Sequence, residues 1–351
     1  MSSRVLTARA LNRSVLNRQL LLERSSLSIP RALERIAGLQ TQYAPSGYIG
    51  LWSRVDGFQR GDLTRALERK RVIQATLMRG TIHMVSARDY PLLAAGIARF
   101  NREWWQRQSR RSGLDARSFK DLIPHVVEAL AAGPRRRDEL IAVVESAGFP
   151  KELWGGLGFW LPMVRVPPSG TWERRRADRY ALSETWLGPE IPSEEHGVEH
   201  LIRRYLRGFG PASLEDAANW AGVTQSTLAA VAERMGLRQF HDEEGETLVD
   251  LPRVTLPPAD TPAPVRFLGT WEAILLVHAR RSRVLSEDHR GEVFSTKNPH
   301  SVPTFLVDGS VAGTWRFQDG TVEVTPFEPL PGAVRAEVEE EAARLAQFHL
   351  A

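Results

Sequence analysis

The apolar positions in residues 30–39 follow helical spacing and form one stripe, made of Leu33, Ile36 and Ala37. Continued by one step, this stripe reaches Gln40, which places a long amide on the face meant for the core. An unpaired buried polar group is costly. We therefore expect Gln40 to find hydrogen-bond partners or to line a cavity.

Gln42 follows two residues later, where the helix is expected to end. Pro45 and Gly47 are expected to break the backbone just beyond it. Side chains two residues apart point the same way only in an extended segment. We therefore expect a non-helical segment that turns both amides, Gln40 and Gln42, toward one site.

The chain then alternates helical patterns with pairs of short strands, which predicts an α+β fold. Helices are expected at 62–69, 87–105, 119–130, 137–146, 151–163, 214–220 and 225–235, and strands at 72–84, 165–182, 237–240 and 247–250. Helices that precede a two-stranded wing are typical of a winged helix. The order predicts three tandem winged-helix units, at residues 1–114, 115–190 and 191–256.

Residues 257–351 have a different pattern after the proline-rich run 257–264. Strands are expected at 265–268, 273–277, 304–307, 313–317 and 321–326, and a closing helix at 333–348. Asp308-Gly309 and Asp319-Gly320 are strong hairpin signals. This part of the chain is predicted to be a small β domain.

The charge of the chain is unevenly distributed. The net charge is +4 and the isoelectric point about 9.7. Arginines cluster at 107–111, 135–137, 174–179 and 280–283, whereas acidic residues gather near 242–246 and 337–341. Segregated charge predicts a surface that faces a polyanion, and nucleic acid is the obvious partner.

Composition also excludes several classes of protein. The chain has no cysteine, so it has no disulfide framework, thiolate nucleophile or cysteine-bound zinc. No apolar run is long enough to span a membrane, and residues 1–22 lack the apolar segment of a secretion signal. We therefore expect a cytoplasmic protein that acts away from the membrane.

One short motif suggests a different chemistry. His196-Gly197-Val198-Glu199-His200 fits the H-x-x-E-H pattern of some zinc peptidases. Such five-residue matches arise by chance, Gly197 lies inside this one, and no third ligand stands out. A zinc site needs its full ligand set, so we expect no metal or other cofactor and keep the zinc peptidase as a distant alternative.

Four stretches resemble one protein family. They are Leu39-Gln40-Thr41-Gln42 with Pro45, Tyr48 and Leu51-Trp52-Ser53-Arg54; Arg79-Gly80-Thr81-Ile82-His83; His278-Ala279-Arg280-Arg281-Ser282-Arg283-Val284-Leu285; and Pro303-Thr304-Phe305-Leu306-Val307-Asp308-Gly309 with Ala312-Gly313-Thr314-Trp315-Arg316. In this order, and over most of the chain, they resemble the AlkZ-type winged-helix DNA glycosylases. The resemblance implies three tandem winged helices and a C-terminal β-barrel, arranged as a C around duplex DNA. Such a clamp needs no partner subunit, so we expect a monomer.

The resemblance also implies the site. The catalytic Gln-x-Gln of the family falls on Gln40 and Gln42. The implied DNA-binding or site-lining residues are Tyr48, Trp52, Arg54, Arg79, Thr81, His83, His278, Arg280, Arg281, Arg283, Trp315 and Arg316. Trp271-Glu272 departs from the Trp/Phe-Asp pair expected at that place.

The family excises N7-alkylated purines, and some members unhook interstrand crosslinks. A glutamine amide is no base at neutral pH, but its oxygen can orient water and lie against the positive charge that develops on the sugar. Such weak assistance suffices for a cationic N7-alkylguanine, because this base leaves as a neutral molecule. The prediction is a monofunctional DNA glycosylase whose partner is double-stranded DNA with alkylated or crosslinked purines.

The alternative is a non-catalytic winged-helix regulator of transcription, since the helix-turn-helix logic is the same. The expected recognition helix, residues 225–235, offers few groups that read bases, and its wing at 243–246 carries acids that repel phosphate. A regulator binds one DNA sequence, whereas a glycosylase binds with little sequence preference.

Overall fold

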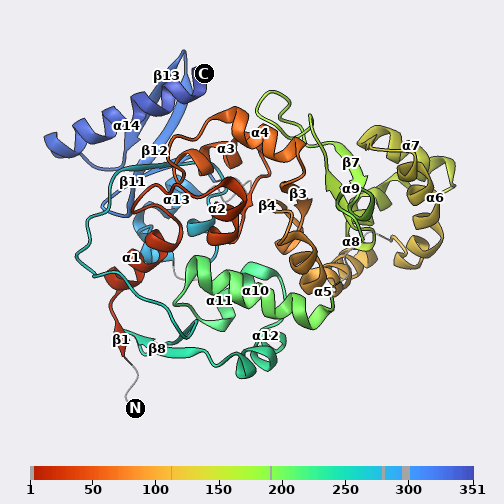
Figure 1. The fold of residues 1–351 in the computed structure, drawn as a ribbon, viewed down its shortest axis with the longest axis horizontal. Coiled ribbons are helices and arrows are strands. Elements are labelled where there is room, and N and C mark those ends of the chain that lie inside the picture. The colour runs from red at the N-terminus through yellow and green to blue at the C-terminus, as the bar shows by residue number, and fades with distance from the viewer. Residues whose placement is uncertain (1–3, 112, 190–191, 279–280, 295–300) are drawn as a thin grey trace.

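The computed structural model describes residues 4–111, 113–189, 192–278, 281–294 and 301–351, and its fold is α+β (Figure 1). Its α-helices are α1 Ala8–Arg18, α2 Ile29–Ile36, α3 Ala44–Trp52, α4 Arg60–Glu68, α5 Tyr90–Arg111, α6 Phe119–Ala131, α7 Arg137–Ser146, α8 Trp154–Trp160, α9 Ser183–Leu187, α10 Glu194–Phe209, α11 Leu214–Ala221, α12 Gln225–Ala232, α13 Arg290–Val293 and α14 Gly332–Leu350. Its strands are β1 Val5–Leu6, β2 Leu39–Gln40, β3 Val72–Thr76, β4 Ile82–Ser86, β5 Arg135–Arg136, β6 Met163–Arg165, β7 Arg179–Leu182, β8 Arg238–Asp242, β9 Thr247–Asp250, β10 Arg266–Leu268, β11 Thr304–Val307, β12 Ser310–Gln318 and β13 Thr321–Pro326.

The strands of the first two expected units form a single sheet. Its order is β2-β4-β3-β6-β7-β5, with antiparallel neighbours throughout. The units meet where β3 pairs with β6, so that Gln74 lies opposite Arg165 and Ala75 opposite Val164. The expected boundary at residue 114 therefore divides strands that share one sheet, and the division into units stays a prediction.

The third expected unit contains a helix-turn-helix followed by a hairpin. At the helix starts, Ser213 accepts a hydrogen bond from the amide of Asp216, and Thr224 accepts one from the amide of Thr227. Gly222 ends α11 with φ 76°, which a glycine adopts without strain. β8 and β9 then pair, and β1 adds to β8 in parallel. The winged-helix interpretation of all three units stays a prediction.

The C-terminal sheet is open, so the expected β-barrel is wrong for the residues that the structure describes. Its order is β10-β11-β12-β13, and the two outer strands, β10 and β13, do not pair. α14 packs against both of them, which places a helix where a barrel would close. The strand expected at 273–277 is also wrong: the chain turns at Trp271, with φ 62°, and forms the 3-10 helix Ala273–Leu275.

Helix α3 corrects another expectation. Pro45 and Gly47 lie inside this helix and do not break it. Pro45 occupies the first turn, where its missing N–H has no intrahelical partner to lose. Gly47 allows close packing, since a Cβ there would lie 2.8 Å from Cγ2 of Thr41. The helix is thereby held directly against the segment that carries Gln40 and Gln42.

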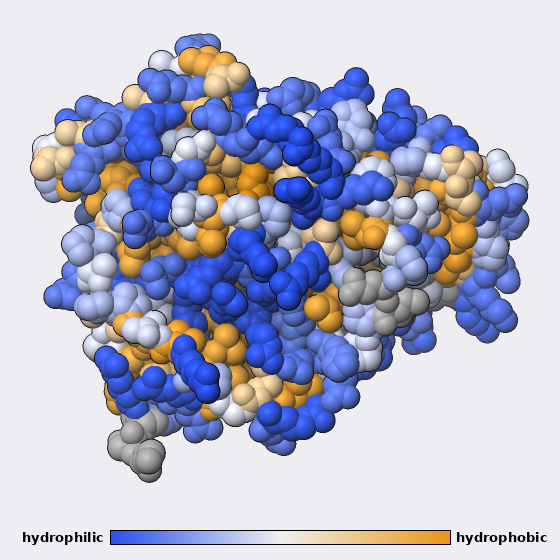
Figure 2. Space-filling view, in the orientation of Figure 1, coloured by the Kyte–Doolittle hydropathy of each residue, from blue (hydrophilic) through white to orange (hydrophobic). Residues whose placement is uncertain are grey.

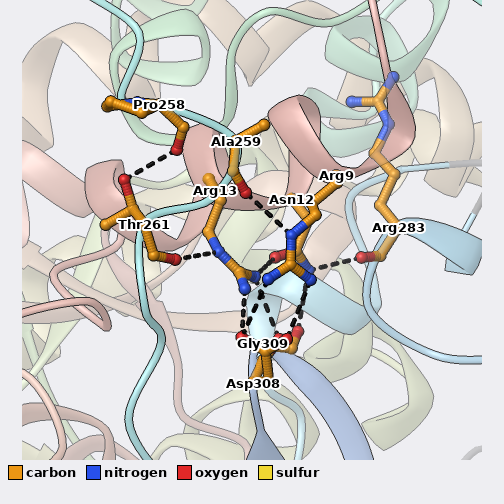
Figure 3. Close-up of polar contacts among 9 residues, drawn as sticks. All are labelled: Arg9, Asn12, Arg13, Pro258, Ala259, Thr261, Arg283, Asp308 and Gly309. Carbon is orange, nitrogen blue, oxygen red and sulfur yellow. Dashed lines mark hydrogen bonds and ion pairs between the residues drawn. The ribbon is translucent and has the colours of Figure 1, made fainter.

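A polar cluster fastens the C-terminal sheet to α1 (Figure 3). The turn Asp308-Gly309 has φ 44° and 81°, as the hairpin signal predicts. Gly309 touches the helix so closely that a Cβ would lie 2.5 Å from Leu16. The buried Arg13 guanidinium pairs with the Asp308 carboxylate and donates to its carbonyl oxygen over 3.0 Å. Helix α1 therefore fixes the position of the hairpin.

One face of the molecule is largely polar. In the view of Figure 2, hydrophilic residues cover most of the face and gather across its middle. Within the described ranges, no helix combines the length and apolar character needed to cross a bilayer.

Candidate active site

The segment that carries the two amides leaves a helix and becomes a strand. α2 ends at Ile36 and not at residue 39, because Ala37 and Gly38 adopt left-handed backbone conformations with φ 64° and 80°. Gln40 therefore falls in β2, directly opposite His83 of β4. The non-helical backbone expected here is confirmed.

Gln40 is held by an arginine from the turn between β3 and β4. Its side chain is buried, with 7% of its surface exposed, and its Oε1 accepts a hydrogen bond from Nη2 of Arg79 over 3.2 Å. Nη1 of Arg79 donates to the carbonyl oxygen of Trp220 over 2.7 Å. The backbone carbonyl of Trp220 fixes the guanidinium of Arg79. The guanidinium in turn orients the Gln40 amide, whose oxygen faces Nη2.

Gln42 is exposed, and its amide has an anchor of its own. Its Oε1 accepts from the backbone N–H of Ile82 over 2.8 Å. An N–H donor requires an oxygen opposite it, so the Nε2 group points away from Ile82. Gln42 lines a cavity of about 240 Å³ together with Thr76, Gly80, Ile82, Trp154, Gly155, Gly158, Phe159, Met163, Arg165 and Tyr180.

His83 lies in β4, and Thr81 directly precedes this strand. A ring nitrogen of His83, Nδ1, lies 3.1 Å from the carbonyl oxygen of Thr81 and donates to it. Burial, with a contribution from the charge of Arg79, lowers the pKa of His83 to about 3. His83 is therefore neutral near pH 7. The structure brings Gln40, Arg79, Thr81 and His83 together, and Gln42 is bound to the backbone of Ile82, between Thr81 and His83.

Other residues implied by the resemblance lie in the interior. Tyr48 is fully buried and its hydroxyl is hydrogen-bonded to Thr64 over 2.9 Å. Trp52 packs under Arg24 with 8% of its surface exposed, and Trp315 donates from Nε1 to the carbonyl of Leu268. Burial in the folded chain shields Tyr48 from direct contact with DNA, and its implied role stays a prediction.

The role of Arg54 also stays a prediction. It is fully buried, and its Nη2 lies 2.7 Å from Oε1 of the buried Glu272. Its Nη1 donates to the carbonyl oxygen of Gly50 over 3.0 Å. Glu272 is the residue that departs from the family pattern, and here it is the partner of Arg54. The pair ties α3 to the C-terminal part of the chain.

The basic run near residue 280 is only partly described. His278 is buried beside Tyr205, with Nδ1 3.5 Å from Asp216. Burial lowers the pKa of Arg283, whose Nη1 donates to the carbonyl of Pro211 over 3.2 Å. Arg280 lies outside the described residues, and Arg281 is described only as the first residue of the 3-10 helix Arg281–Arg283. The structure does not bring His278 or Arg283 into the cluster around Gln40 and Gln42.

The H-x-x-E-H motif lies where α10 crosses α5. Gly197 of α10 meets Gly96 of α5 so closely that a Cβ on Gly197 would lie 2.3 Å from the amide nitrogen of Gly96. Nε2 of His200 lies 3.0 Å from Asp89, and Glu199 pairs with Arg203. Among the described residues, no three histidine or acidic side chains are placed to hold a metal ion.

The structure joins two arginine clusters that lie apart in the sequence. They line one hollow of about 610 Å³ between β5, β7 and the segment 166–178 that precedes β7, which we call the wing segment. Its basic lining residues are Arg135, Arg136, Arg174, Arg175, Arg176 and Arg179, and its acidic ones are Glu139 and Asp178. The pairing of β5 with β7 causes the meeting, and no local sequence signal predicts this pairing.

Comparison with known proteins defines the class. Residues 33–348 match the protein family described as DNA glycosylase AlkZ-like, and the chain belongs to this family. A relative from Streptomyces sahachiroi described as "Interstrand DNA cross-link repair glycosylase" is 25% identical over an alignment that covers 95% of this chain and 94% of the relative. The solved structure of Streptomyces sahachiroi DNA glycosylase AlkZ has the same fold, with a TM-score of 0.84 and 23% identity over 98% of this chain and 97% of that one.

Proposed function

We propose that this protein is a monofunctional DNA glycosylase that hydrolyses the N-glycosidic bond of cationic N7-alkylated purines in double-stranded DNA. Membership of the AlkZ-like family supports this activity. The cross-link repair named for the Streptomyces sahachiroi relative supports extending the substrates to purines held in interstrand crosslinks. We further propose that the protein acts as a monomer.

The observation that carries the proposal is the fixed orientation of two amide oxygens. Oε1 of Gln40 faces Arg79, and Oε1 of Gln42 faces the N–H of Ile82. Each carbonyl oxygen keeps a second lone pair. We assign these lone pairs to the attacking water and to the positive charge that develops on the sugar, because preorganised dipoles stabilise such charge without reorganising.

His83 suits a cationic lesion, whereas the guanidinium of Arg79 carries a positive charge 3.2 Å from Oε1 of Gln40. Because His83 is neutral near pH 7, it adds no positive charge beside a positively charged transition state. An N7-alkylated purine leaves as a neutral base, so it needs no strong general acid. Amides are weak catalysts, and the proposal therefore requires poor activity on undamaged purines.

We also propose that the arginine-lined hollow contacts the DNA backbone. Its six guanidinium groups outnumber its two carboxylates. Contacts of arginine with phosphate release counterions, so they make affinity strongly dependent on salt. This contact is independent of base sequence and suits an enzyme that must act in any sequence.

The test is base release from a duplex that carries a single N7-methylguanine. We expect release by the wild type and a loss of about 100-fold in the Gln42→Ala variant, the size of one lost electrostatic contact. Gln239→Ala is the matched control, because Gln239 is an exposed strand glutamine of the third expected unit. Unchanged base release by Gln42→Ala would show that the Gln42 amide has no role in catalysis. Tight, sequence-specific binding without release would instead identify a regulator.

A further inference from the structure

A second cavity lies beside the candidate active site. Its volume is about 280 Å³, and it forms where the start of α3, the wing segment, strand β12 and the end of α14 meet. Ring side chains from all four of these places line it: Tyr43, Trp172, Trp315, Phe317 and His349. We call this cavity the aromatic pocket. Tyr43 directly follows Gln42 in the chain, so the pocket begins one residue from the candidate catalytic motif.

His349 is the centre of the ring cluster. Phe317 stacks on its imidazole, with ring centroids 4.3 Å apart and planes at 18°. Trp172 meets the same imidazole edge-on at 5.1 Å, and Trp315 does so at 6.0 Å. These contacts hold rings from β12, the wing segment and α14 in fixed orientations, which preorganises flat surfaces for another ring.

The pocket also contains polar atoms that can read the edge of a ring. Nε2 of His349 is buried and has no hydrogen-bond partner within the described part of the chain. Burial, together with the charges of Arg60 and Arg175, lowers the pKa of His349 to about 4, so the imidazole is neutral near pH 7. Ser46 and Thr270 place two hydroxyls in the lining, 2.6 Å apart. The two hydroxyls can hydrogen-bond the edge of a bound heterocycle.

Two arginines complete the lining. Nη1 of Arg175 donates to the hydroxyl of Tyr43 over 2.8 Å, and its guanidinium lies 5.7 Å from the centre of the Tyr43 ring. Arg316 is exposed and pairs with Glu323 over 2.6 Å. A positive group beside stacked rings complements a ligand that joins a flat heterocycle to an anion.

We propose that the aromatic pocket binds one unstacked nucleotide of the DNA, with the base among the rings and its phosphate at Arg175. The inference rests on the proposed function and adds a second binding site to it. Base–aromatic stacking with a positively charged backbone contact is the usual way in which proteins hold unpaired nucleotides. The cavity is slightly smaller than the roughly 300–1,000 Å³ of sites for drug-sized ligands, which suits a single ring system.

The test uses undamaged DNA, so that it does not depend on catalysis. Two duplexes are compared that differ only in one unpaired 2-aminopurine, and affinity is measured by fluorescence anisotropy. We expect the wild type to prefer the duplex with the unpaired base and to quench its fluorescence. In Phe317→Ala this preference should fall about 5- to 150-fold, the range expected for one lost base–aromatic stack.

The chain offers a matched control. Phe327 stacks on His289 with centroids 4.5 Å apart and planes at 22°, but it does not line the pocket. Phe327→Ala should therefore keep both the preference and the quenching. Tyr43→Leu, at an exposed ring, provides a second pocket variant if Phe317→Ala fails to fold.

The outcomes separate the two proposals. Equal affinity of the wild type for both duplexes would contradict the nucleotide site. An undiminished preference in Phe317→Ala and Tyr43→Leu would contradict it as well. Neither result would contradict the proposed glycosylase activity. Failure to bind either duplex would overturn the proposed function as well. Preference lost in the pocket variants and kept in Phe327→Ala would establish the nucleotide site.

Discussion

Arg79 joins Gln40 to the third part of the chain: one guanidinium arm donates to Oε1 of Gln40 and the other to the carbonyl of Trp220. A lysine keeps the charge but has no planar fork that reaches two acceptors. Arg79→Lys should therefore free the Gln40 amide to rotate and slow base release by about tenfold or more. Single-turnover release from an N7-methylguanine duplex measures this effect.

A double-mutant cycle shows whether Arg79 acts through Gln40. If Arg79 only positions the amide, Arg79→Lys should have little further effect in a Gln40→Ala background. Fully additive losses of the two substitutions would show that Arg79 has a separate role. The cycle is needed because burial also lowers the pKa of Arg79, and a buried guanidinium affects folding as well.

His83 should make stability depend on acid pH. Its pKa is lowered from 6.5 to about 3 by burial, so between these values the unfolded chain binds more protons than the folded one. The contribution of His83 is complete above pH 6.5 and is lost as pH falls toward 3, with a slope of up to about 1.4 kcal/mol per pH unit. Urea unfolding between pH 4 and 7 should show a shallower slope for His83→Gln. The exposed His125 provides the control, and a His83→Gln slope equal to that of wild type would contradict the prediction.

The crossing of α5 and α10 predicts a strict requirement for glycine. A Cβ on Gly197 would lie 2.3 Å from a backbone nitrogen of Gly96, which cannot move aside as a side chain can. Gly197→Ala should lower the free energy of unfolding by about 1–3 kcal/mol, the usual cost of overpacking, or more. Gly155→Ala in α8 meets nothing within 4 Å and should be neutral or stabilising by up to about 1 kcal/mol. Similar thermal melts for both variants would rule out this account of the motif.

Local signals predicted most elements. The capping residues Ser213 and Thr224 start their helices as expected, and Asp308-Gly309 forms the expected turn. The break predicted at Pro45 was wrong. A proline breaks a helix when it lies in the interior, but it is well tolerated in the first turn, where Pro45 lies. The same residue type has opposite consequences in these two positions, and sequence alone did not fix where α3 begins.

The arrangement of the site depends on contacts between distant residues. The sequence pointed to Gln40 and Gln42, but not to Ile82 and Trp220, whose backbone groups anchor the amides and their arginine. The type of a residue does not indicate which partner its backbone N–H or carbonyl group binds. The stacking of Phe317 on His349 in the aromatic pocket likewise cannot be predicted before the relative positions of β12 and α14 are known.

Arg54 and Glu272 give the last prediction. The pair is buried, with 2.7 Å between Nη2 of Arg54 and Oε1 of Glu272. Removal of one charge therefore leaves the other charge buried without its partner. Glu272→Gln should lower the free energy of unfolding by about 3–5 kcal/mol. The same change in the exposed pair of Arg316 and Glu323 should cost at most about 1 kcal/mol.

Two further variants separate stability from DNA binding. Glu272→Asp restores the residue that the family resemblance leads one to expect, but it shortens the side chain by one methylene and should destabilise less than Glu272→Gln. Arg54→Met combined with Glu272→Met removes both charges and should recover much of the loss. Because Arg54 is fully buried, the folded double variant should bind DNA as the wild type does. A large loss of affinity in a variant whose urea midpoint is unchanged would show that Arg54 reaches the DNA after all.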